Sequence, residues 1–120
     1  MRLFKNTWFT RFADKEGITD AELRETVNQL EAGQADADLG GGVYKVRVAR
    51  PSEGKAGGYR VIVFFKSEER TFFVYGFAKS DRSNIDQKET REYKALAKKY
   101  LNLSDEIIER AVHSGKFVEI

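Results

Sequence analysis

The sequence predicts an α+β domain in which helices pack against an antiparallel sheet of three to five strands. Apolar residues recur at helical spacing near both ends of the chain, which predicts two N-terminal helices and further helices at the C-terminus. Between them, short runs rich in Val, Phe and Tyr are typical of strands. With 120 residues, the chain is expected to form a single domain spanning residues 1–120.

The first third, residues 1–37, is interpreted as a helical hairpin. Aromatic and small apolar side chains at positions 8, 9, 12 and 13 follow helical spacing, and Gly17 is expected to end that helix. Thr19 and Glu22 then form a capping-box pattern, which predicts a second helix ending at Gly33.

The middle, residues 40–82, is interpreted as a basic antiparallel sheet. Residues 43–49 alternate between apolar and basic side chains, and residues 59–65 and 70–78 are largely apolar or aromatic. A turn at 66–69 is expected to join the last two strands, so the three form a meander. The glycines at 40–42 and 57–58 are expected to supply turns.

Residues 85–120 are interpreted as a C-terminal helical extension. Residues 85–101 carry apolar side chains at helical spacing, and Ser104 is expected to cap a second short helix. Residues 117–120 are predicted to add an edge strand.

Composition restricts the function classes. The chain has no cysteine, which excludes disulfides and thiolate metal sites. No window approaches the roughly 18 consecutive apolar residues of a spanning helix, and the first residues lack the pattern of a signal peptide. We therefore expect a cytoplasmic protein without membrane contact.

The distribution of charge is more informative than its total. The net charge is only +2, but residues 42–82 hold nine basic and four acidic residues, whereas the rest holds twelve basic and fifteen acidic. The predicted sheet is thus basic and the flanking helices are acidic. Charge alone fits solvated strand faces and a phosphate-binding site equally well.

The register of the basic residues favours the phosphate site. Lys45 and Arg47 fall on one face of their predicted strand, and Arg60 begins an otherwise apolar strand. Lys79 and Arg82 follow the end of the neighbouring strand. In a meander these positions converge, and clustered ammonium and guanidinium groups suit a phosphodiester.

Two sequence elements resemble the RelE/HigB superfamily of toxins from type II toxin–antitoxin pairs. Residues 54–60 read Gly-Lys-Ala-Gly-Gly-Tyr-Arg, and residues 75–79 read Tyr-Gly-Phe-Ala-Lys. They match a Gly-Lys-x-Gly-Gly-x-Arg element and a Tyr-Gly-x-x-Lys element of one branch of that superfamily. The resemblance implies a microbial-RNase-like fold, cleavage of mRNA on the ribosome, and neutralisation by an antitoxin encoded nearby.

The resemblance also implies roles for individual residues. Arg60 matches the phosphate-stabilising arginine of the family. Lys45 and Arg47 match the basic pair on the preceding strand, and Lys55 matches a lysine of the glycine loop. The predicted catalytic residues are Arg60, Lys55, Lys45 and Lys79, and the predicted RNA-binding residues are Arg47, Arg50 and Arg82. Members of the family carry a tyrosine in the opening turn of the last helix, and residues 84–87 contain none.

RNA cleavage through the 2′-hydroxyl requires a proton acceptor, charge stabilisation at phosphorus and a proton donor for the leaving oxygen. Lys55 or Lys45 is the predicted acceptor, because neighbouring cations favour the neutral form of a lysine. Tyr75 and Tyr59 are candidates to replace the missing tyrosine. His113, the only histidine, lies outside the basic block and is interpreted as a helix-end residue.

Metal-dependent cleavage is disfavoured because the middle of the chain has few carboxylates, so we expect neither a metal site nor a cofactor. Asp36 and Asp38 precede the glycine turn and are interpreted as turn and strand-entry residues.

Three other functions remain open on sequence. A ParE-like toxin directed at a topoisomerase shares the fold, although Lys55 and Arg60 argue against it. A non-catalytic RNA- or ribosome-binding module would bind RNA without cleaving it. A third alternative is a domain that has lost toxicity.

Overall fold

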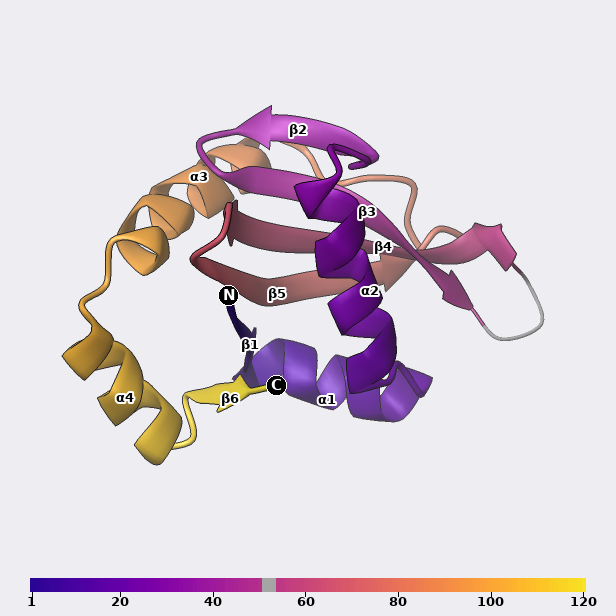
Figure 1. The fold of residues 1–120 in the computed structure, drawn as a ribbon. Coiled ribbons are helices and arrows are strands. Elements are labelled where there is room, and N and C mark those ends of the chain that lie inside the picture. Colours follow the sequence, from indigo (N-terminus) through magenta and orange to yellow (C-terminus); the bar gives the residue numbers. More distant parts are fainter. Residues whose placement is uncertain (51–53) are drawn as a thin grey trace.

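The computed structural model describes residues 1–50 and 54–120, and the side chains of residues 1–49 and 58–120. In chain order the elements are β1 (Arg2–Asn6), α1 (Thr7–Glu16), α2 (Asp20–Glu31), β2 (Ala37–Gly40), β3 (Val43–Arg50), β4 (Gly54–Lys66), β5 (Arg70–Ala78), α3 (Gln87–Leu101), α4 (Asp105–His113) and β6 (Phe117–Glu119) (Figure 1). The α+β class is confirmed.

The strands of the described residues form one six-stranded sheet in the order β2-β3-β4-β5-β1-β6. The predicted meander is present as β3, β4 and β5, and the predicted edge strand is present as β6. The expected number of three to five strands is wrong, and the sheet is mixed rather than antiparallel because β1 pairs parallel to β5.

Strand β1 corrects the interpretation of residues 1–37 as wholly helical. It lies between β5 and β6, and the Phe4 side chain within it is fully buried. Asn6 separates the strand from α1: its side-chain oxygen accepts from Phe9 N at 2.7 Å, and its amide donates to Val74 O at 3.1 Å. Phe4 stands four residues before Trp8, so its spacing also fits a helix.

The helix boundaries follow the predicted capping residues. Gly17 ends α1 in the left-handed conformation. Thr19 and Glu22 form the capping box of α2, and Ser104 caps α4. Helix α3 begins at Gln87 rather than at residue 85, because Asp86 accepts from Glu89 N and fixes the start there.

Gly41 and Gly42 form the predicted turn and Gly40 ends β2 before it; all three glycines have φ between 63° and 89°. Gly57 and Gly58, in contrast, lie within β4, which begins at Gly54 and is longer than predicted, so their interpretation as turn residues is wrong.

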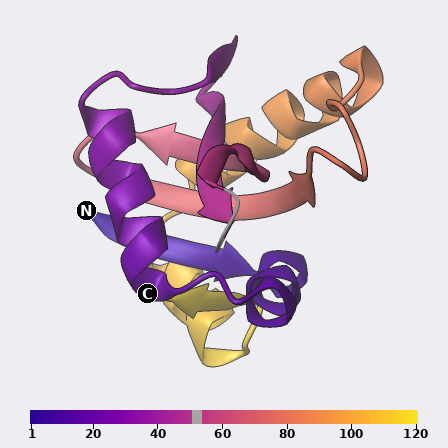
Figure 2. The ribbon, with the colours of Figure 1, turned by 90° about the vertical axis from the view of Figure 1, so that its right-hand side faces the viewer.

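The sheet separates two apolar clusters. One face, which we call the first face, packs against α1 and α2 through residues such as Phe9, Leu23 and Val61. The opposite face, the second face, packs against α3 and α4 through residues such as Ile62 and Phe72. Figure 2 shows the sheet between α2 and α3. Among the described residues, no helix combines the length and apolar character needed to cross a bilayer.

Candidate functional site

Basic side chains from β3 and β4 gather around one carboxylate on the second face. Lys45 and Arg47 alternate with Val46 and Val48, which belong to the first-face cluster. Asp36 Oδ1 accepts from Arg47 Nε at 2.9 Å, and Asp36 Oδ2 lies 3.7 Å from Lys45 Nζ. We call Asp36, Lys45, Arg47 and Arg60 the basic cluster. It brings together three of the five cations that were predicted to converge, whereas Lys79 and Arg82 lie outside it.

Arg60 is the most buried cation of the cluster, with a side chain 5% exposed. Its Nε lies 3.7 Å from Asp36 Oδ2, and its Nη1 is buried without a hydrogen-bond partner in the described part of the chain. Arg60 also stands directly opposite Arg47 in the β3–β4 ladder. Two like charges at such a position repel each other, so the arrangement calls for an anion between them.

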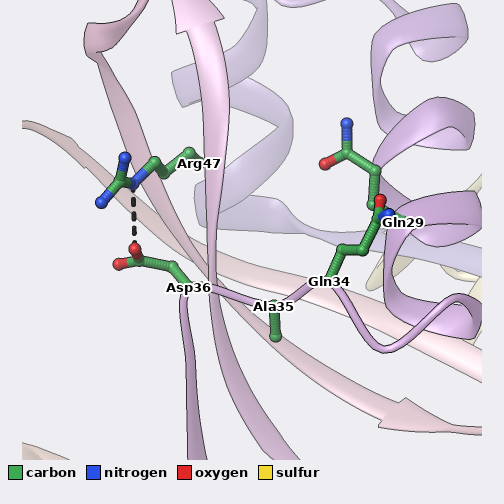
Figure 3. A pocket seen from close by; sticks show the side chains of 5 residues that line it. All are labelled: Gln29, Gln34, Ala35, Asp36 and Arg47. Atoms are coloured by element: carbon green, nitrogen blue, oxygen red, sulfur yellow. Dashed lines mark hydrogen bonds and ion pairs between the residues drawn. The ribbon is translucent and has the colours of Figure 1, made fainter.

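Asp36 reaches the cluster because it extends the β2–β3 hairpin by one residue. Its backbone N donates to Lys45 O at 2.9 Å, just before the pair Ala37 and Lys45. Its side chain is 16% exposed and lines a pocket of about 230 Å³ between the end of α2 and the edge of β3. Figure 3 shows Asp36 and Arg47 facing each other on one side of this pocket, with Gln29 and Gln34 on the other.

The sequence interpretation placed Asp36 correctly before a strand but missed its carboxylate as the partner of the cluster. The signal was the hairpin itself: a glycine turn at 40–42 brings the residues before it alongside the basic strand after it.

Arg82 is held by several partners at the start of α3. It is ion-paired with Glu89, and it donates to Tyr75 Oη at 3.1 Å and to Asn84 O at 2.8 Å. The hydrogen bond between Arg82 and Glu89 raises the pKa of Arg82 and lowers the pKa of Glu89. Lys45 Nζ donates to Asn84 Oδ1 at 3.3 Å, which links this region to the basic cluster.

The remaining predicted residues are placed differently. Lys79 is exposed just past β5. The side chains of Lys55 and Arg50 lie outside the described residues. His113 is exposed at the end of α4. Tyr59 belongs to the first-face cluster and donates to Glu16 at 2.8 Å, so Tyr75 is the one of the two candidate tyrosines that lies on the second face beside Arg82.

A family model described as the RelE toxin of the RelE/RelB toxin–antitoxin system matches residues 1–120. The chain belongs to the RelE toxin family. It is therefore a RelE-type toxin of a toxin–antitoxin system, and membership implies a cognate antitoxin. Toxins of the RelE family are generally ribonucleases.

Tyr93 of α3 stands near the Arg82 region of this RelE-type toxin, with its ring centroid 6.2 Å from that of Tyr75. Burial raises the pKa of Tyr93 to about 12, so its hydroxyl stays protonated at neutral pH. Among the described residues, no group of three or more His, Asp or Glu side chains is placed to hold a metal ion.

The first prediction concerns Asp36 as counter-ion. Asp36→Asn keeps the shape of the side chain but removes its charge, so we expect unfolding free energy to fall by about 1–3 kcal/mol. Sulfate at tens of millimolar should stabilise this variant more than the wild type, because the anion takes the place of the carboxylate. Thermal unfolding with and without sulfate measures both effects.

Asp38→Asn is the matched control, since Asp38 accepts only from Gly40 N in the described structure. Equal sulfate responses of Asp36→Asn and the wild type would contradict the role of Asp36.

The second prediction concerns Glu89. The Arg82 hydrogen bond lowers the folded-state pKa of Glu89 below its ordinary value of 4.5. Glu89 therefore stabilises the fold above that value, and the contribution is lost as pH falls through the folded-state pKa. Glu89→Gln should remove this acid-dependent loss, at a cost of less than about 1 kcal/mol at pH 7. Urea unfolding between pH 7 and pH 3 gives the unfolding free energy at each pH, with Glu92→Gln as the control. Parallel pH profiles of stability for Glu89→Gln and the wild type would refute this role of Glu89.

Proposed function

We propose that this RelE-type toxin is a metal-independent endoribonuclease that cleaves mRNA on the ribosome and thereby inhibits translation. The observation that carries the proposal is the buried Arg60 guanidinium. Its Nη1 has no partner in the part of the chain that the structure describes, and it shares one carboxylate with two further cations. Family membership supports ribonuclease activity, and the α+β architecture supports the microbial-RNase-like fold that the sequence resemblance implies.

The Asp36 carboxylate marks the position proposed for the scissile phosphate. Both groups are anions with several acceptor oxygens, and a phosphate accepts paired N–H bonds from arginine as a carboxylate does. When RNA binds, the phosphate replaces Asp36 as the partner of Arg60. The Nη1 of Arg60 then gains the acceptor that it lacks among the described residues.

The proposed reaction is attack of the 2′-hydroxyl on the adjacent phosphorus. A 2′-O–P bond forms and the P–O5′ bond breaks, which leaves a 2′,3′-cyclic phosphate and a 5′-hydroxyl. Arg60 stabilises the charge that develops on the phosphate oxygens. Lys45 or Lys55 takes the 2′-hydroxyl proton, and Lys79 supplies the proton to the leaving oxygen.

The RNA backbone on either side is assigned to Arg47, Arg50 and Arg82. Arg47 is the most available of them in the described structure, since its side chain is 49% exposed. Arg82 is occupied by Glu89 and holds the Tyr75 hydroxyl, so we assign it a second task in orienting Tyr75 beside the bound RNA.

The test is induced expression of the toxin alone and together with the neighbouring reading frame, which we propose encodes the antitoxin. We expect growth arrest that the neighbour relieves, and mRNA cut within translated regions. In a translation extract, an mRNA with a 2′-deoxynucleotide at the mapped cut should resist cleavage there, because the nucleophile is absent.

Two outcomes would redirect the assignment. Arrest with intact mRNA and inhibited topoisomerase would favour a ParE-like toxin. RNA binding without cleavage would favour a non-catalytic binding module.

A further inference from the structure

A group of aromatic rings lies at the end of β5, and one of them is open to solvent. Trp8 is 44% exposed although its ring contacts two others. Its centroid lies 5.2 Å from that of Phe12, with the rings stacked, and 4.5 Å from that of Tyr75. We call Trp8, Phe12 and Tyr75 the aromatic platform. Tryptophan side chains are enriched at binding interfaces, where the ring offers a large apolar surface to the partner.

The fold places the platform where the pairing of β5 with β1 stops. The parallel ladder ends at the pair Lys5 and Phe73, and Asn6 then turns the chain into α1. Gly76 allows the next contact: a Cβ there would lie 2.5 Å from Phe12 Cε2, so only glycine lets the Phe12 ring sit directly on the strand. Phe12 packs with the first-face cluster and Tyr75 with the second, so Trp8 spans the edge of β5 between them.

Two cations stand beside the open ring. Trp8, Arg11, Phe12 and Lys15 line one pocket of about 290 Å³. They are spaced by three or four residues and therefore share one side of α1. No acidic side chain is among the described residues that line this pocket, and the nearby Glu16 carboxylate accepts from Tyr59 Oη. The pocket thus offers an aromatic wall and positive charge together.

A continuous row of rings connects the platform to the basic cluster. The Tyr75 and Phe77 centroids are 6.1 Å apart, and the Arg82 guanidinium lies 5.8 Å from each ring. Phe77 in turn stands opposite Arg60 in the β4–β5 ladder. Phe77 itself is buried, so the row links the two regions through the body of β5, and a nucleic-acid strand bound at Arg60 would extend toward Trp8 along the surface above it.

We infer that Trp8 is a stacking surface for a nucleobase of single-stranded RNA, and that Arg11 and Lys15 bind the adjoining phosphates. This inference rests on the proposed ribonuclease function and adds a second contact region to it. Aromatic rings stack on any base, and nearby cations bind the backbone, which together form the usual single-strand binding surface. The paired cations favour RNA over a purely apolar peptide as the occupant.

Trp8 is the only tryptophan of the chain, so its fluorescence reports on this position directly. The probe is a short 2′-O-methyl RNA labelled with a dye at one end, which lacks the nucleophile and stays intact. We expect the labelled RNA to gain anisotropy on addition of the toxin, and an unlabelled copy to quench Trp8. Replacing single bases of the oligonucleotide with abasic sites should relieve the quenching at one position.

Trp8→Ala should weaken binding of this RNA by roughly five-fold or more, and Trp8→Phe should retain most of the affinity. Arg11→Glu should weaken binding as well, and its loss of affinity relative to the wild type should grow as the salt concentration falls. Ile107→Ala is the matched control, because Ile107 is a similarly exposed apolar residue on the remote α4. Circular dichroism of each variant establishes that it is folded.

The results of these experiments test the Trp8 stacking surface separately from the proposed ribonuclease function. A gain of anisotropy without Trp8 quenching, and with unchanged affinity of Trp8→Ala, overturns the stacking surface alone. No RNA binding by the wild type overturns the stacking surface, whereas the proposed function is judged by the expression and translation-extract experiments above. Loss of antitoxin affinity in Trp8→Ala with unchanged RNA affinity would assign the platform to the protein partner instead and overturn the inference.

Discussion

Replacing Arg60 by alanine is expected to abolish toxicity and to slow single-turnover RNA cleavage by about two to three orders of magnitude. Arg60 is the buried cation of the basic cluster, and its Nη1 has no partner in the described part of the chain. A preorganised donor of this kind acts on the charge that develops in the transition state. Its removal should therefore lower the rate of cleavage more than the affinity for RNA.

The fold should survive this substitution. Asp36 keeps Arg47 at 2.9 Å and Lys45 at 3.7 Å, so its carboxylate is not left without a partner. The substitution also removes a buried nitrogen that forms no hydrogen bond with any residue that the structure describes. Circular dichroism and thermal unfolding check that the Arg60→Ala protein is folded before its activity is compared.

Arg60→Lys distinguishes charge from geometry. It keeps the positive charge but loses the planar fork that binds two phosphate oxygens, so we expect partial recovery of cleavage. Arg110→Ala, which makes the same change of charge on an exposed residue of α4, should remain fully toxic. Full toxicity of a folded Arg60→Ala protein would refute the assignment of Arg60.

The parts of the fold that were predictable are those encoded locally. Gly17 requires the left-handed conformation, and the Thr19–Glu22 pair satisfies helix N–H groups within four residues. The strand β5 was predicted with its full bounds, Arg70–Ala78, because turn residues precede it and a run of buried side chains fills it. Such signals need no knowledge of the rest of the chain.

Strand β1 depends on contacts that are remote in sequence. Its partners are β5, about 70 residues away, and β6, more than 110 residues away. Five residues are too few to show a period, and Phe4 fits helical and extended spacing equally well. The six-stranded order and the parallel pair could therefore not be read from the local pattern.

The same distinction applies to the basic cluster. The period of a strand predicted that Lys45 and Arg47 share a face, and the apolar surroundings of Arg60 indicated its burial. The contribution of Asp36 follows from the register of the β2–β3 hairpin, and the partners of Arg82 follow from the start of α3 at Gln87. Neither the register of the hairpin nor the start of the helix could be read from the local sequence.

Gly76→Ala is expected to destabilise the protein by about 1–3 kcal/mol. The new Cβ would lie 2.5 Å from Phe12 Cε2 and 3.0 Å from Phe12 Cζ. The Phe12 ring has little room to withdraw, because it packs against Phe9, Tyr59 and Trp8. Gly76 is not among the glycines with positive φ, so alanine suits its backbone and would otherwise stabilise the fold. Urea unfolding gives the change in free energy.

A double-mutant cycle isolates the contact. Phe12→Leu removes the two ring atoms nearest the new methyl group, so Gly76→Ala should cost at least about 1 kcal/mol less in that background than in the wild type. Gly33→Ala is the control: Gly33 has φ +75° and open space around it, so its cost should be the same in both backgrounds.

The cycle also connects stability to the RNA contact. If Gly76 holds Phe12 in place and Phe12 supports Trp8, then Gly76→Ala should shift the Trp8 emission spectrum of the folded protein. Phe12→Leu should reduce that shift. Additive unfolding free energies and an unchanged spectrum would show that Gly76 neither positions Phe12 nor supports the aromatic platform.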